Sequence, residues 1–238
     1  MGVAKVILFS IQFSVVFSAL PQIKKCRLTD TDCTTSSAQL VVPVLVAGIP
    51  EVGSEPLDPI LVDVINVDLA GLKLTIRDAK IYGLGGAVID KMSVDEMKKE
   101  MKLIFHANLT VRGKYTASGR LLILPISGNG ENVIKLINCQ MIVDMFYDIT
   151  KNKDGKDVIQ LKTYKYNYDV KDNAYFHLSN LFNGNKGLSD TMHTFMNSSW
   201  KLLLEEFGRP VFTKPVQKVF NAIKALLNSQ VLEDIAII

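Results

Sequence analysis

The chain has 238 residues, of which 48% are hydrophobic, and its formal net charge is +3 at pH 7. This length allows one large domain or two small ones. The excess positive charge is small and dispersed, and no basic stretch is interleaved with aromatic residues, so nucleic acid is not an expected partner.

The N-terminus has the pattern of a secretory signal peptide. Lys5 precedes the apolar run VILFSIQFSVVF, which is followed by the small residues Ser18 and Ala19. The run is shorter than the roughly 20 residues that cross a bilayer. We therefore expect residues 1–19 to be removed, after Ser18 or Ala19, and the mature protein to be secreted and extracellular. No later segment has the composition of an integral membrane helix.

Three cysteines follow in a chain for which export permits disulfides. Cys26 and Cys33 lie close together in CRLTDTDC, so a disulfide between them is expected. A metal site is the alternative, but it lacks a nearby His or third Cys. Cys139 is left over. It alternates with Ile137 and Met141, which favours a buried free thiol over a reactive nucleophile.

A short helix, broken near Pro43, is predicted at 36–46. The next segment, GIPEVGSEPLDPI, contains three prolines and two glycines and indicates an extended loop.

Alternating apolar and polar residues then predict strands over most of 60–178. One apolar and one polar face indicate an antiparallel sheet that is covered on one side, and the length of the strands favours strong curvature. Asp154-Gly155 predicts a hairpin turn. The segments with the clearest alternation are LKLTIRDAKIYGL, KLIFHANLTVRGKYTASGRLLILPIS, VIKLINCQMIVDMFYDI and DVIQLKTYKYNYDV.

A long helical pattern begins near Ser189, a plausible N-cap, and continues to about Leu227. Pro210 and Pro215 are expected to kink it. Apolar residues lie on several sides of this helix, so it needs a cover on several sides. A long curved sheet could supply that cover, because a continuous helix of this length would extend about 60 Å. We therefore predict a single α+β domain over 20–238, in which the sheet wraps the C-terminal helix.

Five ordered blocks of sequence resemble the insect takeout and juvenile hormone-binding protein family, over about residues 26–227. The blocks are CRLTDTDC, GIPEVGSEPLDPI, LKLTIRDAKIYGL, GKYTASGRLLILPISGNGE and HLSNLFNGNKGLSDTMHTFMNSSW. The resemblance is to takeout more than to the dedicated hormone carriers, whose second disulfide has no counterpart because Cys139 lacks a free partner.

The resemblance implies a sheet-wrapped helix enclosing an elongated apolar tunnel of the tubular lipid-binding type. It also implies a secreted carrier of a juvenile hormone-like terpenoid, fatty acid or other lipid, with links to circadian, feeding or hormone-response physiology. We expect a monomer that needs no cofactor and is not an enzyme. A secreted signalling or interaction protein whose tunnel is filled or unused is the alternative.

Candidate tunnel-lining residues are the large apolar and aromatic side chains expected on the inward faces. A tyrosine hydroxyl or the Trp200 indole could bind a polar ligand head group. For each residue, ordinary core packing is the competing interpretation. The candidates are Phe105, Leu109, Tyr115, Met141, Val143, Tyr164, Tyr166, Tyr168, Met192, Phe195, Met196, Trp200, Leu203 and Phe207.

Catalytic and metal signals are weak. GLGGAV resembles the start of a dinucleotide loop, but no helix pattern follows it. There is no G-x-S-x-G motif, and His106, His177 and His193 lack metal-ligand spacing. Two glycosylation sequons begin at Asn108 and Asn197, of which Asn108 is expected on a polar strand face.

Overall fold

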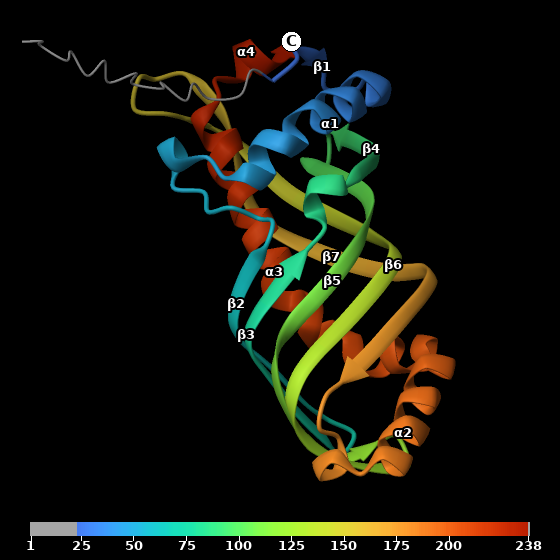
Figure 1. The fold of residues 1–238 in the computed structure, drawn as a ribbon. Coiled ribbons are helices and arrows are strands. Elements are labelled where there is room, and N and C mark those ends of the chain that lie inside the picture. Colours follow the sequence, from blue (N-terminus) through green and yellow to red (C-terminus); the bar gives the residue numbers. More distant parts are fainter. Residues whose placement is uncertain (1–22, 238) are drawn as a thin grey trace, which may run out of the picture.

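The computed structural model describes residues 23–237, so the predicted signal peptide at 1–19 lies outside the described residues. Within this range, helices lie near both ends of the chain and strands lie between them (Figure 1). The elements are β1 (Cys26–Arg27), α1 (Thr31–Ala47), η1 (Pro50–Val52), β2 (Ile60–Leu69), β3 (Leu72–Tyr82), η2 (Leu84–Gly86), β4 (Val88–Asp95), β5 (Glu100–Leu121), β6 (Leu124–Lys151), β7 (Asp157–Leu178), η3 (Phe182–Gly184), α2 (Lys186–Ser198), α3 (Trp200–Ser229), α4 (Leu232–Ile235) and β8 (Ala236–Ile237).

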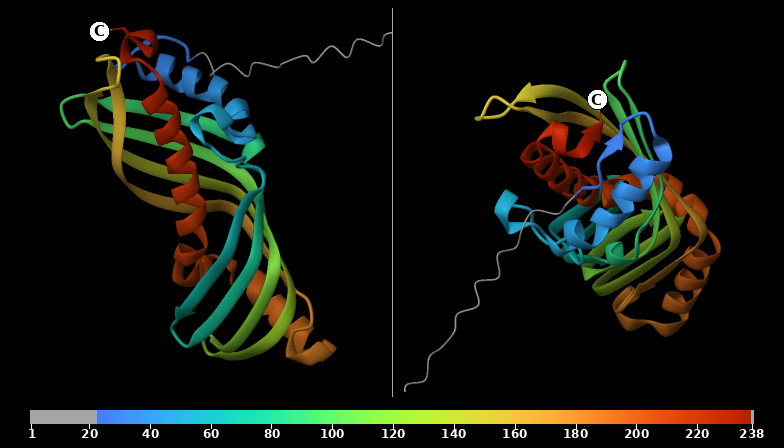
Figure 2. Two further views of the ribbon diagram at one scale, coloured as in Figure 1. Left: turned by 90° about the vertical axis from the view of Figure 1, so that its left-hand side faces the viewer. Right: turned by 90° about the horizontal axis from the view of Figure 1, so that it is seen from above.

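A six-stranded antiparallel sheet forms the wall of the molecule. Its strand order is β2-β3-β5-β6-β7, and β4 pairs with β5 beside β3. The long strand β5 makes this possible, because its first part pairs with β4 and its second part with β3. The sheet curves strongly around α3, as the two further views show (Figure 2). The predicted fold class, a curved antiparallel sheet wrapped around a long helix, is confirmed.

Helix α3 closes the open side of the sheet. It packs against both edge strands, β2 and β7, and lies lengthwise between them (Figures 1 and 2). Its 30 residues extend about 45 Å. Pro210 and Pro215 lie inside it without ending it. The helix is buried on several sides, as its sequence pattern indicated.

The prediction of one continuous helix from Ser189 was wrong. The chain forms α2 first and leaves helical geometry at Ser199, whose φ and ψ are −106° and 20°. The N-cap of α2 is Asn185, whose side chain accepts a hydrogen bond from the Leu188 N–H at 3.1 Å. A separate α2 can turn across the end of β7, where its side chains bind the strand.

A β-bulge in β6 changes the face on which its residues lie. Asn138 has a φ of 54°, and the pairing registers of β6 with both neighbours shift beside it. Leu136 and Cys139, three positions apart, are therefore both buried. The prediction that Ile137 shares the Cys139 face was wrong, because Ile137 lines a groove on the outside of the sheet with Lys135.

Helix α1 covers one end of the sheet. It begins after the N-cap Asp30, continues through Pro43 and is longer than the predicted helix at 36–46. The Cys26–Cys33 disulfide is present, with a Cα–Cα distance of 5.7 Å, which confirms that prediction. Cys139 is free and buried.

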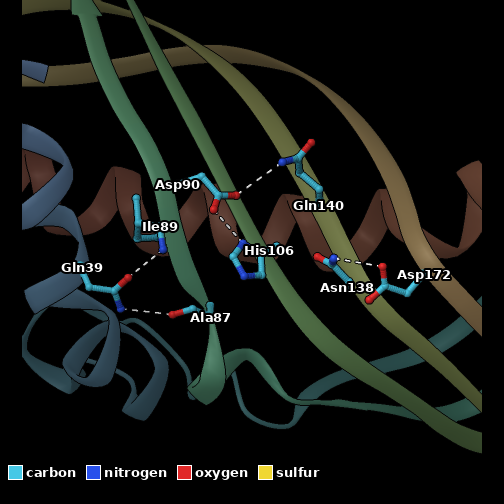
Figure 3. A network of polar contacts seen from close by, with 8 residues as sticks. All are labelled: Gln39, Ala87, Ile89, Asp90, His106, Asn138, Gln140 and Asp172. Atoms are coloured by element: carbon cyan, nitrogen blue, oxygen red, sulfur yellow. Dashed lines mark hydrogen bonds and ion pairs between the residues drawn. The ribbon is translucent and has the colours of Figure 1, made fainter. Parts of the chain in front are cut away.

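Polar side chains bind α1 to the sheet and connect neighbouring strands on the outer face of the sheet (Figure 3). The Gln39 carboxamide donates to the Ala87 carbonyl at 3.2 Å and accepts from the Ile89 N–H at 2.7 Å. It thereby satisfies backbone groups on the free edge of β4. On the neighbouring strands, the Asp90 carboxylate lies 2.7 Å from His106 Nδ1 and accepts a hydrogen bond from Gln140 Nε2 at 3.5 Å.

Candidate functional site

Three apolar chambers lie along the interior between the sheet and the helices. The α1 chamber, about 160 Å³, lies between α1, β4 and the end of α3. The middle chamber, about 40 Å³, lies between α3 and strands β2, β3, β5 and β6. The α2 chamber, about 80 Å³, lies between β3, β5, β6, the end of β7 and the start of α3. Together they follow the length of the wrapped helix.

Neighbouring chambers share walls. Leu103, Met145 and Ile223 line both the α1 chamber and the middle chamber. Val111, Leu136, Val211 and Phe212 line both the middle chamber and the α2 chamber. The three spaces are therefore successive compartments of one apolar path that is interrupted by side chains.

The lining of this path is almost free of polar groups. Every residue that lines the middle chamber and the α2 chamber is apolar. The polar residues of the α1 chamber are Lys24, Thr34 and Ser37, and the two hydroxyls donate to backbone carbonyls, among them those of Met92 and Lys24. A molecule in the path would thus be held mainly by apolar contacts.

Half of the predicted tunnel-lining residues lie on these walls. The middle chamber is lined by Phe105 and Leu109 from β5 and by Met141 and Val143 from β6. The α2 chamber is lined by Met196 from α2 and by Leu203 and Phe207 from α3.

The other predicted residues do not line the three chambers. Met192 and Tyr115 are buried, and Phe195, Trp200, Tyr164, Tyr166 and Tyr168 are partly buried and pack against the core. These residues contribute to packing between the elements rather than to the chamber walls.

The tyrosine hydroxyls connect elements to one another. Tyr168 donates to the Leu204 carbonyl at 2.7 Å, and its ring lies 4.1 Å from that of Phe212. Tyr166 lies within hydrogen-bond distance of Thr213 and of the Arg209 carbonyl. Tyr115 donates to the Ser179 carbonyl at 2.7 Å. Strand β7 is thus fastened to α3 by the hydroxyls that the sequence suggested for a ligand head group.

Burial makes the Tyr115 and Tyr168 hydroxyls harder to ionise. It raises the pKa of Tyr115 to about 12 and, together with the neighbouring Tyr166, raises the pKa of Tyr168 to about 12. The inner faces around the chambers therefore offer a ligand no charged side chain from these positions.

Sequence analysis missed many wall residues. Those on β2, β3 and η2 come from the side of the sheet for which no inward set was chosen, and the missed α3 residues of the middle chamber lie beyond Phe207. The 3-4 spacing after Pro210 carries the signal that could have found the α3 residues. Alternation in LKLTIRDAKIYGL could not have found Ile81, because a register shift near Asp78 separates it from the face of Leu72, Leu74 and Ile76. The missed residues of the middle chamber are Ile60, Ile81, Leu84, Leu103, Val111, Leu136, Met145, Val211, Phe212, Pro215, Val216, Val219, Phe220 and Ile223.

A wider groove lies outside the sheet between β6, β7, η3 and α2. It is lined by polar groups that include His177, Asp190 and His193, and the two imidazole rings stack with centroids 5.1 Å apart. Between residues 23 and 237, no group of three or more His, Cys, Asp or Glu side chains is placed to hold a metal ion. No helix in the same range is long and apolar enough to cross a membrane.

The two sequon asparagines have different surroundings. Asn108 is exposed at the outer face of β5, and its Oδ1 accepts from the Asn138 N–H at 2.8 Å. Asn138 in turn donates to Asp172 at 3.3 Å (Figure 3). Asn197 is half-buried where α2 meets β7.

The comparisons agree with this architecture. The model of the family described as haemolymph juvenile hormone binding protein matches residues 6–235. The circadian clock-controlled protein daywake of Drosophila melanogaster is 32% identical over 213 residues, which cover 84% of this chain and 81% of that protein. A putative beta-carotene-binding protein of Schistocerca gregaria is 25% identical over 130 residues, which cover 53% and 52%.

A solved structure shares the whole arrangement. The crystal structure of Epiphyas postvittana Takeout 1 matches with a TM-score of 0.88 and 45% sequence identity. The match covers 91% of this chain and 100% of the Takeout 1 chain. The family match spans nearly the full sequence, and the structural match includes the curved sheet and the long C-terminal helix. The chain belongs to the takeout and haemolymph juvenile hormone binding protein family.

Proposed function

We propose that this protein is a secreted carrier that binds an elongated hydrophobic small molecule along the path through the three chambers. The observation that carries the proposal is the shared walls, which join three apolar compartments in series. The family is named for binding a lipid-like hormone, and a relative is named for binding beta-carotene. A juvenile hormone-like terpenoid, a fatty acid or another lipid fits this chemistry.

Apolar burial can supply the binding free energy. Moving apolar surface out of water gains roughly 25 cal/mol for each Å² buried, less the cost of ordering the ligand. A long hydrocarbon chain has enough surface to bind without an ionic partner. The all-apolar walls of the middle and α2 chambers suit such a chain.

The side chains between chambers must move to admit such a ligand. Met145 stands between the α1 and middle chambers, and Phe212 stands between the middle and α2 chambers. Methionine is flexible and polarizable, so Met141 and Met145 can adjust to an irregular ligand at small cost. We expect the ligand to replace contacts that these side chains now make with each other.

The small volume of the middle chamber favours a second candidate function. At about 40 Å³, this chamber is close to a packed core. A filled path is what a secreted signalling or interaction protein that does not use a tunnel would have. Ligand binding therefore has to be measured.

Secretion and physiology belong to the same proposal. The expected signal peptide at 1–19 would direct the chain to the extracellular space, and daywake is named as a circadian clock-controlled protein. A role in circadian, feeding or hormone-response physiology is consistent with a soluble carrier. N-terminal sequencing of protein from the culture medium of insect cells tests the leader, since the mature chain should begin after residue 18 or 19.

Native mass spectrometry of the full chain secreted from insect cells tests the carrier function. We expect a stoichiometric adduct that is released on denaturation and recovered in organic solvent as a long apolar molecule. A Leu136→Trp variant fills the wall shared by two chambers and should lose the adduct. Lys135→Trp, on the outer face of the same strand, is the matched control and should keep it.

Added lipids complete the test, because a host cell could lack the natural ligand. A wild-type protein that carries no adduct and takes up neither fluorescent fatty acids nor terpenoid esters would reject the carrier proposal. Equal binding by the Leu136→Trp and Lys135→Trp variants would instead place the ligand outside the three chambers.

A further inference from the structure

Asn132 is a buried polar side chain on the inner face of β6. It is 1% exposed and shares this face with Ile134 and Leu136, which are also buried. Its Nδ2 is 3.5 Å from the Val111 carbonyl, the one partner it has in the described part of the chain. Its Oδ1 has no hydrogen-bond partner among residues 23–237.

The residues around Asn132 are those of the α2 chamber. Across the sheet, Asn132 pairs with Gly113 of β5 and with Leu178 of β7. Leu178 and Ile134 line the chamber, and so does Val111, which accepts the amide hydrogen bond. Asn132 itself is not a wall residue, so its carboxamide lies behind this wall at one end of the apolar path, and a ligand would reach it by displacing these side chains.

No nearby protein group satisfies the free oxygen. Tyr115 lies on β5 two residues after Gly113, the partner of Asn132. Its hydroxyl donates to the Ser179 carbonyl at 2.7 Å and so is not free to donate to Asn132. Reversing the carboxamide would place Oδ1 against the Val111 carbonyl oxygen, so the orientation is fixed by that contact. A buried acceptor without a donor is destabilising, which an apolar residue at this position would avoid.

We propose that Asn132 Oδ1 accepts a hydrogen bond from an O–H group at the end of the bound lipid. This inference rests on the proposed carrier function and specifies its ligand. The ligand would be a long-chain alcohol or a protonated long-chain acid, with its O–H terminus at the α2 chamber and its hydrocarbon tail directed toward the α1 chamber. A ligand whose polar groups are an ester, an ether or an epoxide has no hydrogen to donate to this oxygen.

Matched ligand pairs measure this selectivity. The probes are 1-hexadecanol against its methyl ether, and hexadecanoic acid against its methyl ester, each displacing the fluorescent reporter N-phenyl-1-naphthylamine from the full mature chain. A purely apolar tunnel should bind the ether and the ester at least as tightly, because they cost less to remove from water. Wild-type protein should instead prefer the alcohol by about 3- to 10-fold, the usual effect of one buried hydrogen bond.

Two variants locate the effect. Asn132→Leu keeps the size of the side chain and removes the acceptor, so the preference for the O–H ligand should disappear. Lys135→Leu makes an apolar substitution on the outer face of the same strand, away from the chambers, and should retain the preference. The affinities of the alcohol and the acid are compared at low and neutral pH. If the acid binds only when protonated, its affinity should fall as the pH rises, whereas the affinity of the alcohol should not change.

Each outcome decides a different point. If wild-type protein binds both members of each pair equally, the inference fails and a buried water is the partner of Asn132, while the carrier function stands. If the preference survives in Asn132→Leu, the assignment to Asn132 fails. If no probe displaces the reporter and no lipid binds, the carrier function fails and the inference fails with it. Should Asn132→Leu not fold, the wild-type preference still decides whether the path selects a ligand with an O–H group.

Discussion

The Asn197 side chain binds both backbone groups of Phe176. Its Oδ1 accepts from the Phe176 N–H at 2.7 Å, and its Nδ2 donates to the Phe176 carbonyl at 3.3 Å. Strand β7 is an edge of the sheet, so these groups have no neighbouring strand. At the opposite end of the molecule, Gln39 binds the Ala87 carbonyl and the Ile89 N–H, which flank the first residue of β4. Carboxamides from two helices thus protect two free strand edges.

This contact predicts which sequon is used. A glycan is attached to the amide nitrogen, which in Asn197 already donates to β7 within a half-buried contact. Asn108 is exposed, and its Oδ1 can keep its bond to Asn138 when the nitrogen carries a sugar. Protein from insect cells should carry one glycan. The Asn108→Gln variant should lose the mass of that glycan, whereas Asn197→Gln should not, and a loss from Asn197→Gln would contradict the assignment.

Gly208→Ala tests the contact between α3 and β7. Alanine normally stabilises a helix interior by about 1 kcal/mol over glycine. Here the added Cβ would lie 2.5 Å from the Tyr168 hydroxyl, which is bonded to Leu204 and cannot move freely. We expect a net loss of roughly 1–2 kcal/mol in unfolding free energy, because overpacking outweighs the gain in propensity.

The same substitution in a Tyr168→Phe background is the control. Without the hydroxyl the closest contact is removed, so Gly208→Ala should cost less there than in the wild type. Denaturant unfolding of the four proteins gives the coupling energy. Equal costs in both backgrounds would show that the Tyr168 hydroxyl does not restrict residue 208.

His193 makes the stability of the α2 contact depend on pH. Its Nε2 accepts from the Leu178 N–H at 3.0 Å, which requires the neutral ring. Burial, followed by the nearby His177, lowers the pKa of His193 below its ordinary value, and a backbone hydrogen bond of Ser189 and the Asp190 charge only partly oppose this. Lys135 and Lys186 line the same groove.

The folded state therefore binds a proton less readily than the unfolded state does. Stability from His193 is complete above the ordinary pKa of about 6.5 and is lost as the pH falls toward the lowered folded-state pKa. A His193→Gln variant retains an acceptor but does not titrate. Thermal melting between about pH 5 and pH 8 should show wild type losing stability relative to this variant on acidification. A constant difference would contradict the prediction.

Cys139 should be unreactive in the folded protein. It is 0% exposed, and burial, aided by the Asp169 carboxylate, raises the pKa of its thiol to about 12. Thiolate is the reactive form, so both access and ionisation oppose modification. Titration with a thiol reagent should find no reactive thiol in native conditions and one in denaturant, because Cys26 and Cys33 are paired. Fast labelling of the native protein would contradict this.

Much of the sheet could be predicted from the sequence because its two faces have different surroundings. Phe105, Ala107, Leu109 and Val111 are all buried as their alternation indicated. The disulfide could be predicted because the two cysteines are near in sequence and the N-terminal pattern implied export. In each case, local sequence carries the relevant signal.

The features that were missed depend on distant parts of the chain. The end of α2 at Ser199 and the bulge at Asn138 are settled by contacts with β7 and β5, which alternation alone does not reveal. The Tyr168 hydroxyl finds its partner 36 positions away, on a helix whose rotation the sequence leaves open. Chamber walls are equally unpredictable, because they depend on where two packed surfaces fail to meet.

The pairing of β1 with β8 places both ends of the described chain together. Cys26 lies opposite Ala236 and Arg27 opposite Ile237 in parallel register, and Cys26 and Ile235 also line the α1 chamber. Figure 1 shows this end far from α2. A tag or a fusion partner at either terminus would therefore lie near the α1 chamber. A protein immobilised on a sensor through its C-terminus would present its α2 end to the solution. If ligands enter beside α1, lipid uptake measured on such a surface would differ from uptake measured in solution.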